Sequence, residues 1–246
     1  GKKDSQQVTT ILTINMKRLL FSSIFFAVTV IANAQTFAIK NVPSTSEDYK
    51  LLLEAKGYKS FAFDVTALKD DTYWIEPVIQ HYKNGLLVKN DFEFSIQFSN
   101  RDMLATDDKD YVQQMRQSGM IYDEENGILS LCEKLRVGFF PSDNQLVRMM
   151  QFYVTERGTF TMPLMFEAQT DPNMGEEYNN YGFRQFLVNE IVLDKFIPLA
   201  MCGTYWYDEE IQRYRFCGDD ILTDDITSSL LTDVKEYYII GMKVHK

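Results

Sequence analysis

Histidine and cysteine are scarce in this sequence, and their scarcity limits the chemistry that the chain can perform. Among its 246 residues there are only two histidines, His81 and His245, and three cysteines. A Ser–His–Asp or Cys–His catalytic site would have to use His81, which shares an expected strand face with Ile75 and Ile79 and suits a packed, hydrogen-bonded role. No zinc spacing, glycine-rich phosphate loop or nucleophile elbow is present. The sequence therefore indicates no catalytic residue, no cofactor and no metal ion.

Basic residues are also few in comparison with acidic ones. The chain has 25 lysines and arginines against 35 aspartates and glutamates, which gives a net charge of −10. A negative field of this kind repels phosphate backbones and anionic lipid surfaces, so we expect neither nucleic acid nor a membrane surface as a partner. The 14 tyrosines and 18 phenylalanines, without any low-complexity tract, instead favour a packed globular protein.

The apolar run over residues 19–31 has the features of a cleavable export signal. A basic pair at residues 17–18 precedes it, and an Ala-Asn-Ala motif at residues 32–34 follows it. These are the three parts of a signal peptidase substrate. A transmembrane helix is disfavoured because the run is shorter than the ~20 residues that a bilayer crossing needs. We therefore expect a signal peptide over residues 16–34 and a periplasmic, cell-surface or secreted protein.

This signal divides the chain into three expected parts. Residues 1–15 are an upstream extension, residues 16–34 the signal, and residues 35–246 a single domain without a membrane span. Two small sandwiches that divide near residues 119–126 are the alternative. Removing residues 1–34 takes away four basic residues and one acidic residue, so the exported part has a net charge of −13.

Apolar and polar residues alternate along much of the exported part. Residues 92–98 and 160–166 both place aromatic or aliphatic side chains at every second position, as half-buried antiparallel strands do. Asn84-Gly85 and Asn126-Gly127 supply the positive φ angles that tight hairpins need. Because no strand–helix–strand rhythm is present, we expect a mainly β fold, an antiparallel β-sandwich that is jelly-roll-like and has one or two short helices.

Helix is expected in only two places. Residues 107–118 have a helical composition, with Thr106 as the N-cap and Gly119 as the end. Acidic residues at the start of this helix suit its dipole, and they lack the ligand spacing of a calcium-binding loop. Residues 46–56 suit a helix or a first strand equally well.

Two of the three cysteines bracket a segment that we expect to form a hairpin. If residues 209–210 form its tip, Cys202 lies opposite Cys217. In an oxidising compartment such a pair would be joined as a disulfide. The alternative is that these two cysteines and Cys132 are all free, because a bridge across adjacent strands has a strained geometry.

The same hairpin carries the candidate ligand-binding residues. In this register Tyr205 lies opposite Tyr214, and the indole of Trp206 can stack on the guanidinium of Arg213. Exposed aromatic rings on a ribbon can form a platform for sugar rings, although core or cross-strand packing explains such residues as well. The candidate residues are Tyr205, Trp206, Tyr207, Arg213 and Tyr214.

A resemblance points in the same direction. The Ala-Asn-Ala-Gln sequence at residues 32–35, followed by an acidic chain rich in tyrosine and phenylalanine, resembles the uncharacterised secreted β-rich proteins of Gram-negative gut anaerobes, a domain of unknown function. The resemblance carries no functional motif and therefore implies no site residue.

The sequence has many turns and aromatic residues but no recognisable combination of catalytic residues. This favours a non-enzymatic binding or adhesion module, with a glycan or a protein as its ligand. The first alternative is a secreted glycoside hydrolase that uses two carboxylates. The second is a structural subunit that assembles with copies of itself by strand exchange. Neither the ligand nor the oligomeric state follows from the sequence.

The signal interpretation predicts the N-terminus of the exported protein. When the natural gene is expressed with its own export route, the envelope or culture fraction should contain a chain that begins at Gln35, because the motif places the cut after Ala34. Intact-mass measurement identifies this start. An Ala34→Phe variant should accumulate uncut, and an exported protein that retains Met16 would contradict the interpretation.

Overall fold

The computed structural model describes residues 46–246 apart from 89–95, 171–176, 219, 224–225 and 227. The described residues belong to one compact unit, Ser46–Lys246. The expected upstream extension, signal peptide and cleavage site lie outside the described residues, as does most of the expected strand over residues 92–98. The segment 119–126 lies inside the compact unit, and strands on either side of it pair with each other.

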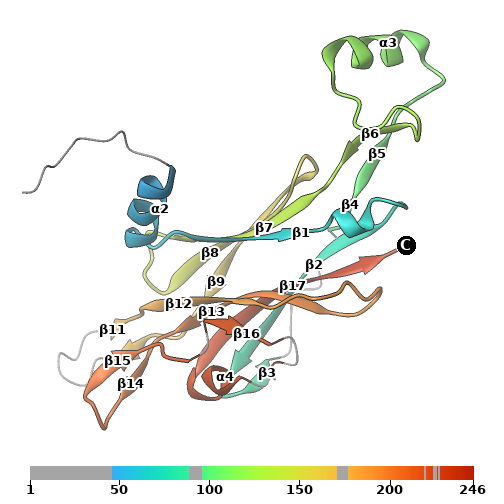
Figure 1. Cartoon of the computed structure of the whole chain (residues 1–246). Coiled ribbons are helices and arrows are strands. Elements are labelled where there is room, and N and C mark those ends of the chain that lie inside the picture. Colours follow the sequence, from blue (N-terminus) through green and yellow to red (C-terminus); the bar gives the residue numbers. More distant parts are fainter. Residues whose placement is uncertain (1–45, 89–95, 171–176, 219, 224–225, 227) are drawn as a thin grey trace, which may run out of the picture. The chain divides into compact units, whose positions relative to one another are not determined.

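The first sheet, sheet A, has four antiparallel strands in the order β1-β7-β8-β9 (Figure 1). These are β1 (Lys59–Asp64), β7 (Lys134–Pro141), β8 (Val147–Val154) and β9 (Gly158–Met165). The expected alternation decides which side chains face inward, because successive residues of a strand point to opposite faces. The inward residues of β7, β8 and β9 are buried and apolar: Leu135, Val137, Phe139, Met150, Phe152, Val154, Met162 and Leu164.

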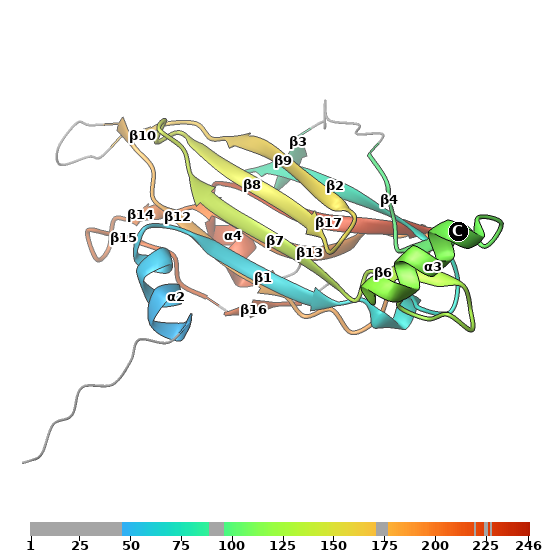
Figure 2. The ribbon, with the colours of Figure 1, turned by 90° about the horizontal axis from the view of Figure 1, so that it is seen from above.

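The second sheet, sheet B, faces sheet A across the main core, and Figure 2 shows the strands of sheet A lying over those of sheet B. Its strands run in the order β16-β12-β13-β17-β2-β3, and β4 also pairs with β2. All pairs are antiparallel except β12 with β16. The strands are β2 (Trp74–Lys83), β3 (Leu86–Val88), β4 (Phe98–Ser99), β12 (Tyr181–Phe186), β13 (Ile197–Thr204), β16 (Ile221–Leu222) and β17 (Glu236–His245).

The second face of sheet B is covered as well, by the segment between β13 and β17. This segment contains β14 (Trp206–Asp208), β15 (Arg213–Arg215) and the short helix α4 (Ser229–Asp233). Its apolar side chains form a second core with residues of β12, β13 and β17. The centre of sheet B is therefore buried on both faces, which explains why β13 and β17 are almost continuously apolar and do not alternate.

Three α-helices are described where one or two had been expected. The ambiguous N-terminal segment forms α2 (Ser46–Ala55), and the second expected helix is α3 (Lys109–Ser118). The N-cap of α3 is Asp108, which accepts a hydrogen bond from the Tyr111 amide, and not the predicted Thr106. The left-handed Gly119 ends α3 as predicted. The remaining elements are η1 (Thr66–Leu68), β5 (Arg101–Met103), β6 (Ile128–Leu131), β10 (Gln169–Thr170) and β11 (Glu177–Tyr178).

The mainly β prediction is thus confirmed, with two facing sheets around one main core. The turn prediction at residues 84–85 is also confirmed, since Asn84 and Gly85 have φ angles of 51° and 74° and connect β2 to β3. Sheet A is a meander, because β7, β8 and β9 are neighbours both in the sequence and in space.

The position of the core predicts how two adjacent residues of β8 respond to truncation. Phe152 is fully buried between the sheets, whereas Gln151 is exposed on the outer face of sheet A. Phe152→Ala should lower the free energy of unfolding by about 3–5 kcal/mol, while Gln151→Ala should change it by less than about 0.5 kcal/mol. Urea unfolding measures both values. Equal effects of the two changes would mean that the inward face has been assigned incorrectly.

Candidate functional site

One end of the sandwich has a charged side chain at a core-facing position. Arg148 lies two residues before Met150 and four before Phe152 on β8, so it points towards sheet B. Its guanidinium carbon lies 4.9 Å from the ring centroid of Tyr181 and 5.4 Å from that of Phe183, both on β12. Arg148 therefore bridges the two sheets through cation–π contacts where the apolar core ends.

Arg148 has no ionic partner within the described part of the chain. No carboxylate there lies within ion-pair distance of its guanidinium, and its Nε atom is enclosed without a hydrogen-bond partner. Burial lowers the pKa of Arg148, and the neighbouring Cys202 and Tyr181 oppose this shift. Buried charges in proteins are normally paired, because an isolated one loses hydration without compensation. An unpaired guanidinium is the arrangement expected where an external anion completes the pair.

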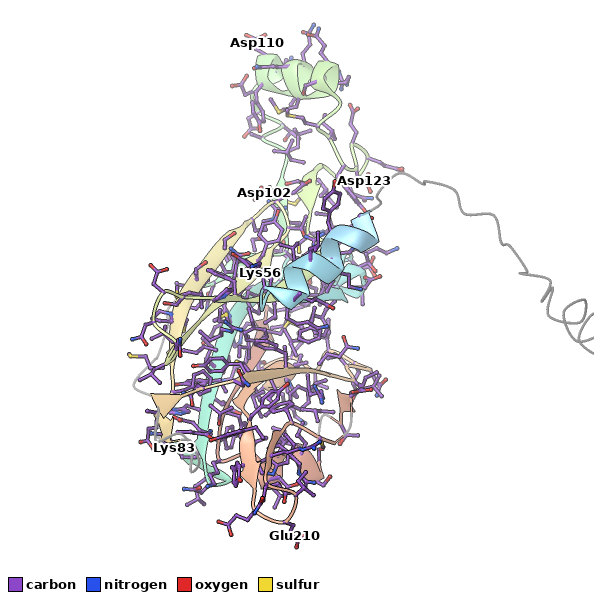
Figure 3. All side chains as sticks on the ribbon, turned by 90° about the vertical axis from the view of Figure 1, so that its left-hand side faces the viewer. Lys56, Lys83, Asp102, Asp110, Asp123 and Glu210 are labelled. Carbon is purple, nitrogen blue, oxygen red and sulfur yellow. The ribbon has the colours of Figure 1, made fainter. Side chains whose placement is uncertain are left out.

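The guanidinium lines a cavity of about 510 Å³, a volume within the range of small-molecule sites. Three parts of the chain form its walls: the end of α2, the turn between β7 and β8, and the residues around the start of β12. Figure 3 faces this end of the sandwich, with Lys56 labelled at the end of α2. The polar lining residues besides Arg148 are Glu54, Ser142, Asn144, Gln145, Asn179, Asn180, Tyr181 and Tyr205. We call this cavity the Arg148 cleft.

The turn after α2 leaves room for the guanidinium. Gly57 has a φ angle of +81°, and a Cβ atom at this position would lie 2.7 Å from Nη2 of Arg148. Only glycine satisfies both the backbone angle and the close approach. The acid on this side of the cleft is Glu54, whose Oε1 accepts a hydrogen bond of 2.8 Å from Lys59. That hydrogen bond lowers the pKa of Glu54, and the carboxylate is committed to Lys59 and not to Arg148.

The opposite wall of the cleft contains a second group with unused hydrogen-bonding capacity. Asn179 is 8% exposed, and its Nδ2 donates to the carbonyl oxygen of Glu167 at 3.0 Å. Its Oδ1 is buried and has no partner among the described residues. Next to it, the Tyr181 hydroxyl donates to the carbonyl oxygen of Gln145 at 2.5 Å, and burial raises the pKa of Tyr181 to about 12. The cleft thus combines an unpaired cation with an unused acceptor.

The predicted hairpin exists, but its register was wrong. Trp206 lies opposite Arg215 and Tyr207 opposite Tyr214, two residues away from the expected pairing of Trp206 with Arg213. The guanidinium near the indole is accordingly that of Arg215, 5.5 Å from the ring centroid. The cause is the turn, which occupies residues 209–212 instead of 209–210. Gln212 adopts a φ angle of 51° there, and the side chain of Asp208 accepts two backbone amides of the turn.

The five candidate residues of the hairpin do not share one surface. Trp206 is only 8% exposed and packs on Phe216 in the second core. Tyr205 lines the Arg148 cleft, whereas Tyr207 and Tyr214 line a separate cavity of about 380 Å³. Arg213 is exposed beside the tip, where Figure 3 labels Glu210. A ligand role for these residues stays a prediction, and Tyr205 is the one that lies beside the unpaired cation.

The disulfide prediction was wrong for this structure, in which the three cysteines are free. Cys202 lies on β13 and pairs with Phe183 of β12 and Tyr238 of β17, so the hairpin strand β15 does not face it. Its thiol is enclosed in the main core, and burial raises its pKa. Cys217 is exposed, so the two thiols occupy different environments.

A family model matches residues 28–246, a range that includes every described strand. The chain belongs to the DUF5041 family. The family is described as a domain of unknown function. No curated protein and no solved structure matches the chain. The match therefore relates the whole fold of this DUF5041 domain to its family and assigns no role to any residue.

A second polar cluster of the DUF5041 domain lies at the β2–β17 pair, and the Glu167 backbone connects it to Asn179 of the cleft. Nε2 of His81 lies 2.8 Å from Oε1 of Glu236, and the backbone amide of Glu167 donates to Oε2 at 2.7 Å. Burial would raise the pKa of Glu236, but the hydrogen bonds with His81 and Glu167 and the charge of Lys83 lower it. His81 also stacks on Tyr238 at 4.1 Å, so the packed, hydrogen-bonded interpretation of this histidine agrees with its contacts.

Two further observations concern the described part of the DUF5041 domain. It contains no group of three or more histidine, cysteine, aspartate or glutamate side chains that could hold a metal ion. None of its helices is long and apolar enough to cross a bilayer.

The lowered pKa of Glu236 predicts how stability depends on pH. A carboxyl group with a depressed folded-state pKa stabilises the protein above its ordinary value of 4.5, and this contribution is lost as the pH falls through the folded-state pKa. Glu236→Gln should therefore lower the free energy of unfolding at pH 7 by about 1–3 kcal/mol and flatten its decline below pH 4.5. Chemical unfolding between pH 7 and 3 measures both effects. Glu209→Gln, at the exposed hairpin tip, is the control, and a variant profile parallel to that of the wild type would disprove the linkage.

Proposed function

We propose that this chain is an exported, non-enzymatic binding module whose ligand occupies the Arg148 cleft. The observation that carries the proposal is the core-facing guanidinium without an anionic partner among the described residues. The chain has 35 acidic residues, so carboxylates are abundant, yet no described carboxylate pairs with Arg148, and Glu54, the one that lines the cleft, is engaged by Lys59. An unpaired, half-buried cation costs stability, and an anionic ligand would reduce that cost.

Arginine is well suited to hold such a ligand. Its planar guanidinium forms paired hydrogen bonds with carboxylates and similar oxyanions, and stacking on Tyr181 and Phe183 holds the plane in place. Because the site is partly desolvated, the attraction at contact is stronger than it would be in water. The net negative charge of the protein opposes long-range attraction, so we expect specificity to come from short-range contacts.

The cleft lining favours binding over catalysis. Amides, a serine, tyrosines and one arginine line it, and its one carboxylate, Glu54, is engaged by Lys59. A carboxylate-dependent glycoside hydrolase, the first alternative, needs a general acid with a raised pKa. The buried Glu236 has a lowered pKa and fixed hydrogen-bond partners, which suits a structural role better.

The other parts of the proposal rest on the sequence. Residues 16–34 support export, and the acidic composition argues against nucleic acid as the ligand. Assembly by strand exchange is the second alternative, and the molecular mass of the purified protein in solution tests it.

The proposal predicts a binding defect without a folding defect when Arg148 is neutralised. In titrations with acetate, glucuronate, sulfate and phosphate, the wild type should bind at least one of these anions. Arg148→Met should weaken that binding at least tenfold. Arg148→Lys should retain part of the binding, because lysine keeps the positive charge but lacks the planar guanidinium that forms paired hydrogen bonds. The melting temperature of Arg148→Met should be equal to that of the wild type or higher.

The matched control is Arg136→Met. Arg136 lies on the outer face of the same sheet and stacks on Tyr153 at 5.6 Å, so its loss should leave anion binding unchanged. Unchanged binding by Arg148→Met, or a wild type that binds none of the four anions, would rule out the Arg148 cleft as an anion site.

A further inference from the structure

We propose that the group held by Arg148 is the carboxylate of a sugar acid, a hexuronate unit of a glycan. This inference rests on the proposed function and specifies the ligand class of the same cleft. Its basis is the combination of one unpaired cation with neutral hydrogen-bonding groups in one small cavity.

The unused acceptor on Asn179 argues against a simple oxyanion. A phosphate, sulfate or carboxylate group that is fully ionised offers acceptors only, so it could satisfy Arg148 but not Oδ1 of Asn179. That atom needs a donor, and a hydroxyl group supplies one. A sugar acid carries a carboxylate and several hydroxyl groups on one rigid ring, so it can satisfy both residues.

A third group in the cleft offers a donor. The Oδ1 of Asn144 accepts the backbone amide of Leu146 at 2.9 Å, which leaves its Nδ2 without a partner among the described residues. Amide donors and acceptors placed around a cation match the alternating donor and acceptor capacity of sugar hydroxyl groups. The aromatic ring of Tyr205, stacked on Phe216 at 5.4 Å, also lines the cavity and adds an apolar surface of the kind on which sugar rings pack.

The charge of the cleft indicates a ligand group with a single negative charge. Arg148 is the one cation among the residues described as lining the cavity, and Glu54 is neutralised by Lys59. Doubly charged phosphate groups are usually held by several cations or by a helix N-terminus, and neither is found among these lining residues. The single positive charge of one guanidinium is balanced by the single negative charge of one carboxylate.

The strand that carries Arg148 does not favour a peptide ligand. β8 pairs with β7 on one side and β9 on the other, and Arg148 itself lies opposite Pro141 and Leu164. A peptide therefore cannot add to this strand by backbone pairing, the recognition mode that β proteins commonly use. A compact ring that enters from the end of the sandwich fits the position of the cavity better.

The test compares matched sugars by isothermal titration on the folded protein. The probes are methyl glucuronoside, its methyl ester, methyl glucoside, glucose 6-sulfate, glucose 6-phosphate, acetate and an acetylated dipeptide with a free carboxylate. Methyl glucuronoside should bind at least tenfold more tightly than each of the other probes. Arg148→Met should abolish the tenfold preference over methyl glucoside, since that preference depends on the carboxylate.

A second variant tests recognition of the sugar hydroxyl groups independently of recognition of the carboxylate. Asn179→Ala should weaken the binding of methyl glucuronoside about three- to tenfold. It should leave the binding of acetate unchanged, because acetate has no hydroxyl group that could donate to Asn179. Gln151→Ala, on the outer face of sheet A, is the control and should bind like the wild type. Melting temperatures of all variants show that they are folded.

The outcomes distinguish the two proposals. If acetate, the sulfate, the phosphate or the dipeptide binds as tightly as methyl glucuronoside, and Arg148→Met still loses that binding, the sugar-acid class is overturned and the anion site stands. If Arg148→Met binds every probe like the wild type, or if no probe binds the wild type, both proposals fall. Equal binding of the glucuronoside and its methyl ester overturns the role of the carboxylate.

Discussion

The burial of β17 on both faces is the constraint on which the rest of the structure depends. One face of β17 places Ile240, Met242 and Val244 in the main core, and the other places Tyr237 and Ile239 in the second core. Its neighbours are β2, from early in the described chain, and β13. Sheet B is therefore completed only when residues 74–83 meet residues 236–245, and both the facing sheet and the covering segment pack on that pair.

The Arg148 cleft is a consequence of how the sandwich ends. The alternation that directs Met150 and Phe152 into the core also directs Arg148 inward, against two aromatic rings of β12. Contacts with Tyr181 and Phe183 offset part of the cost of placing a cation there. Under the proposed function, the remaining cost is reduced when an anionic ligand binds.

The two polar clusters differ in how their charges are paired: Glu236 is buried, and Arg148 is half-buried. Glu236 is surrounded by His81, Lys83 and the Glu167 amide, so its charge ties β17 to β2 and to the end of β9. Arg148 has aromatic contacts but no countercharge among the described residues. A completed network stabilises and orients the strands around it, whereas an incomplete one retains the capacity to bind.

The class of fold and some strands followed from local patterns. Period-two alternation over residues 160–166 predicted β9, because half-burial imposes that spacing on a strand at the surface of a core. Tyr205 was predicted from the hairpin, and it lines the cleft. Arg148 was missed. It lies two residues before the buried Met150 on β8, so a charge at core-facing spacing was the available signal for the site.

The sequence by itself determined the class of fold, the strand faces and the tight turn at Asn84-Gly85, since each depends on residues close together in the chain. Tertiary structure decided what depends on distant residues. The pairing of β2 with β17, the free state of Cys202 and Cys217, and the missing countercharge of Arg148 are all of this kind. The hairpin register depended on a left-handed φ at Gln212, which no local pattern favours. Whether a buried charge is paired can be known only when every neighbour in space has been placed.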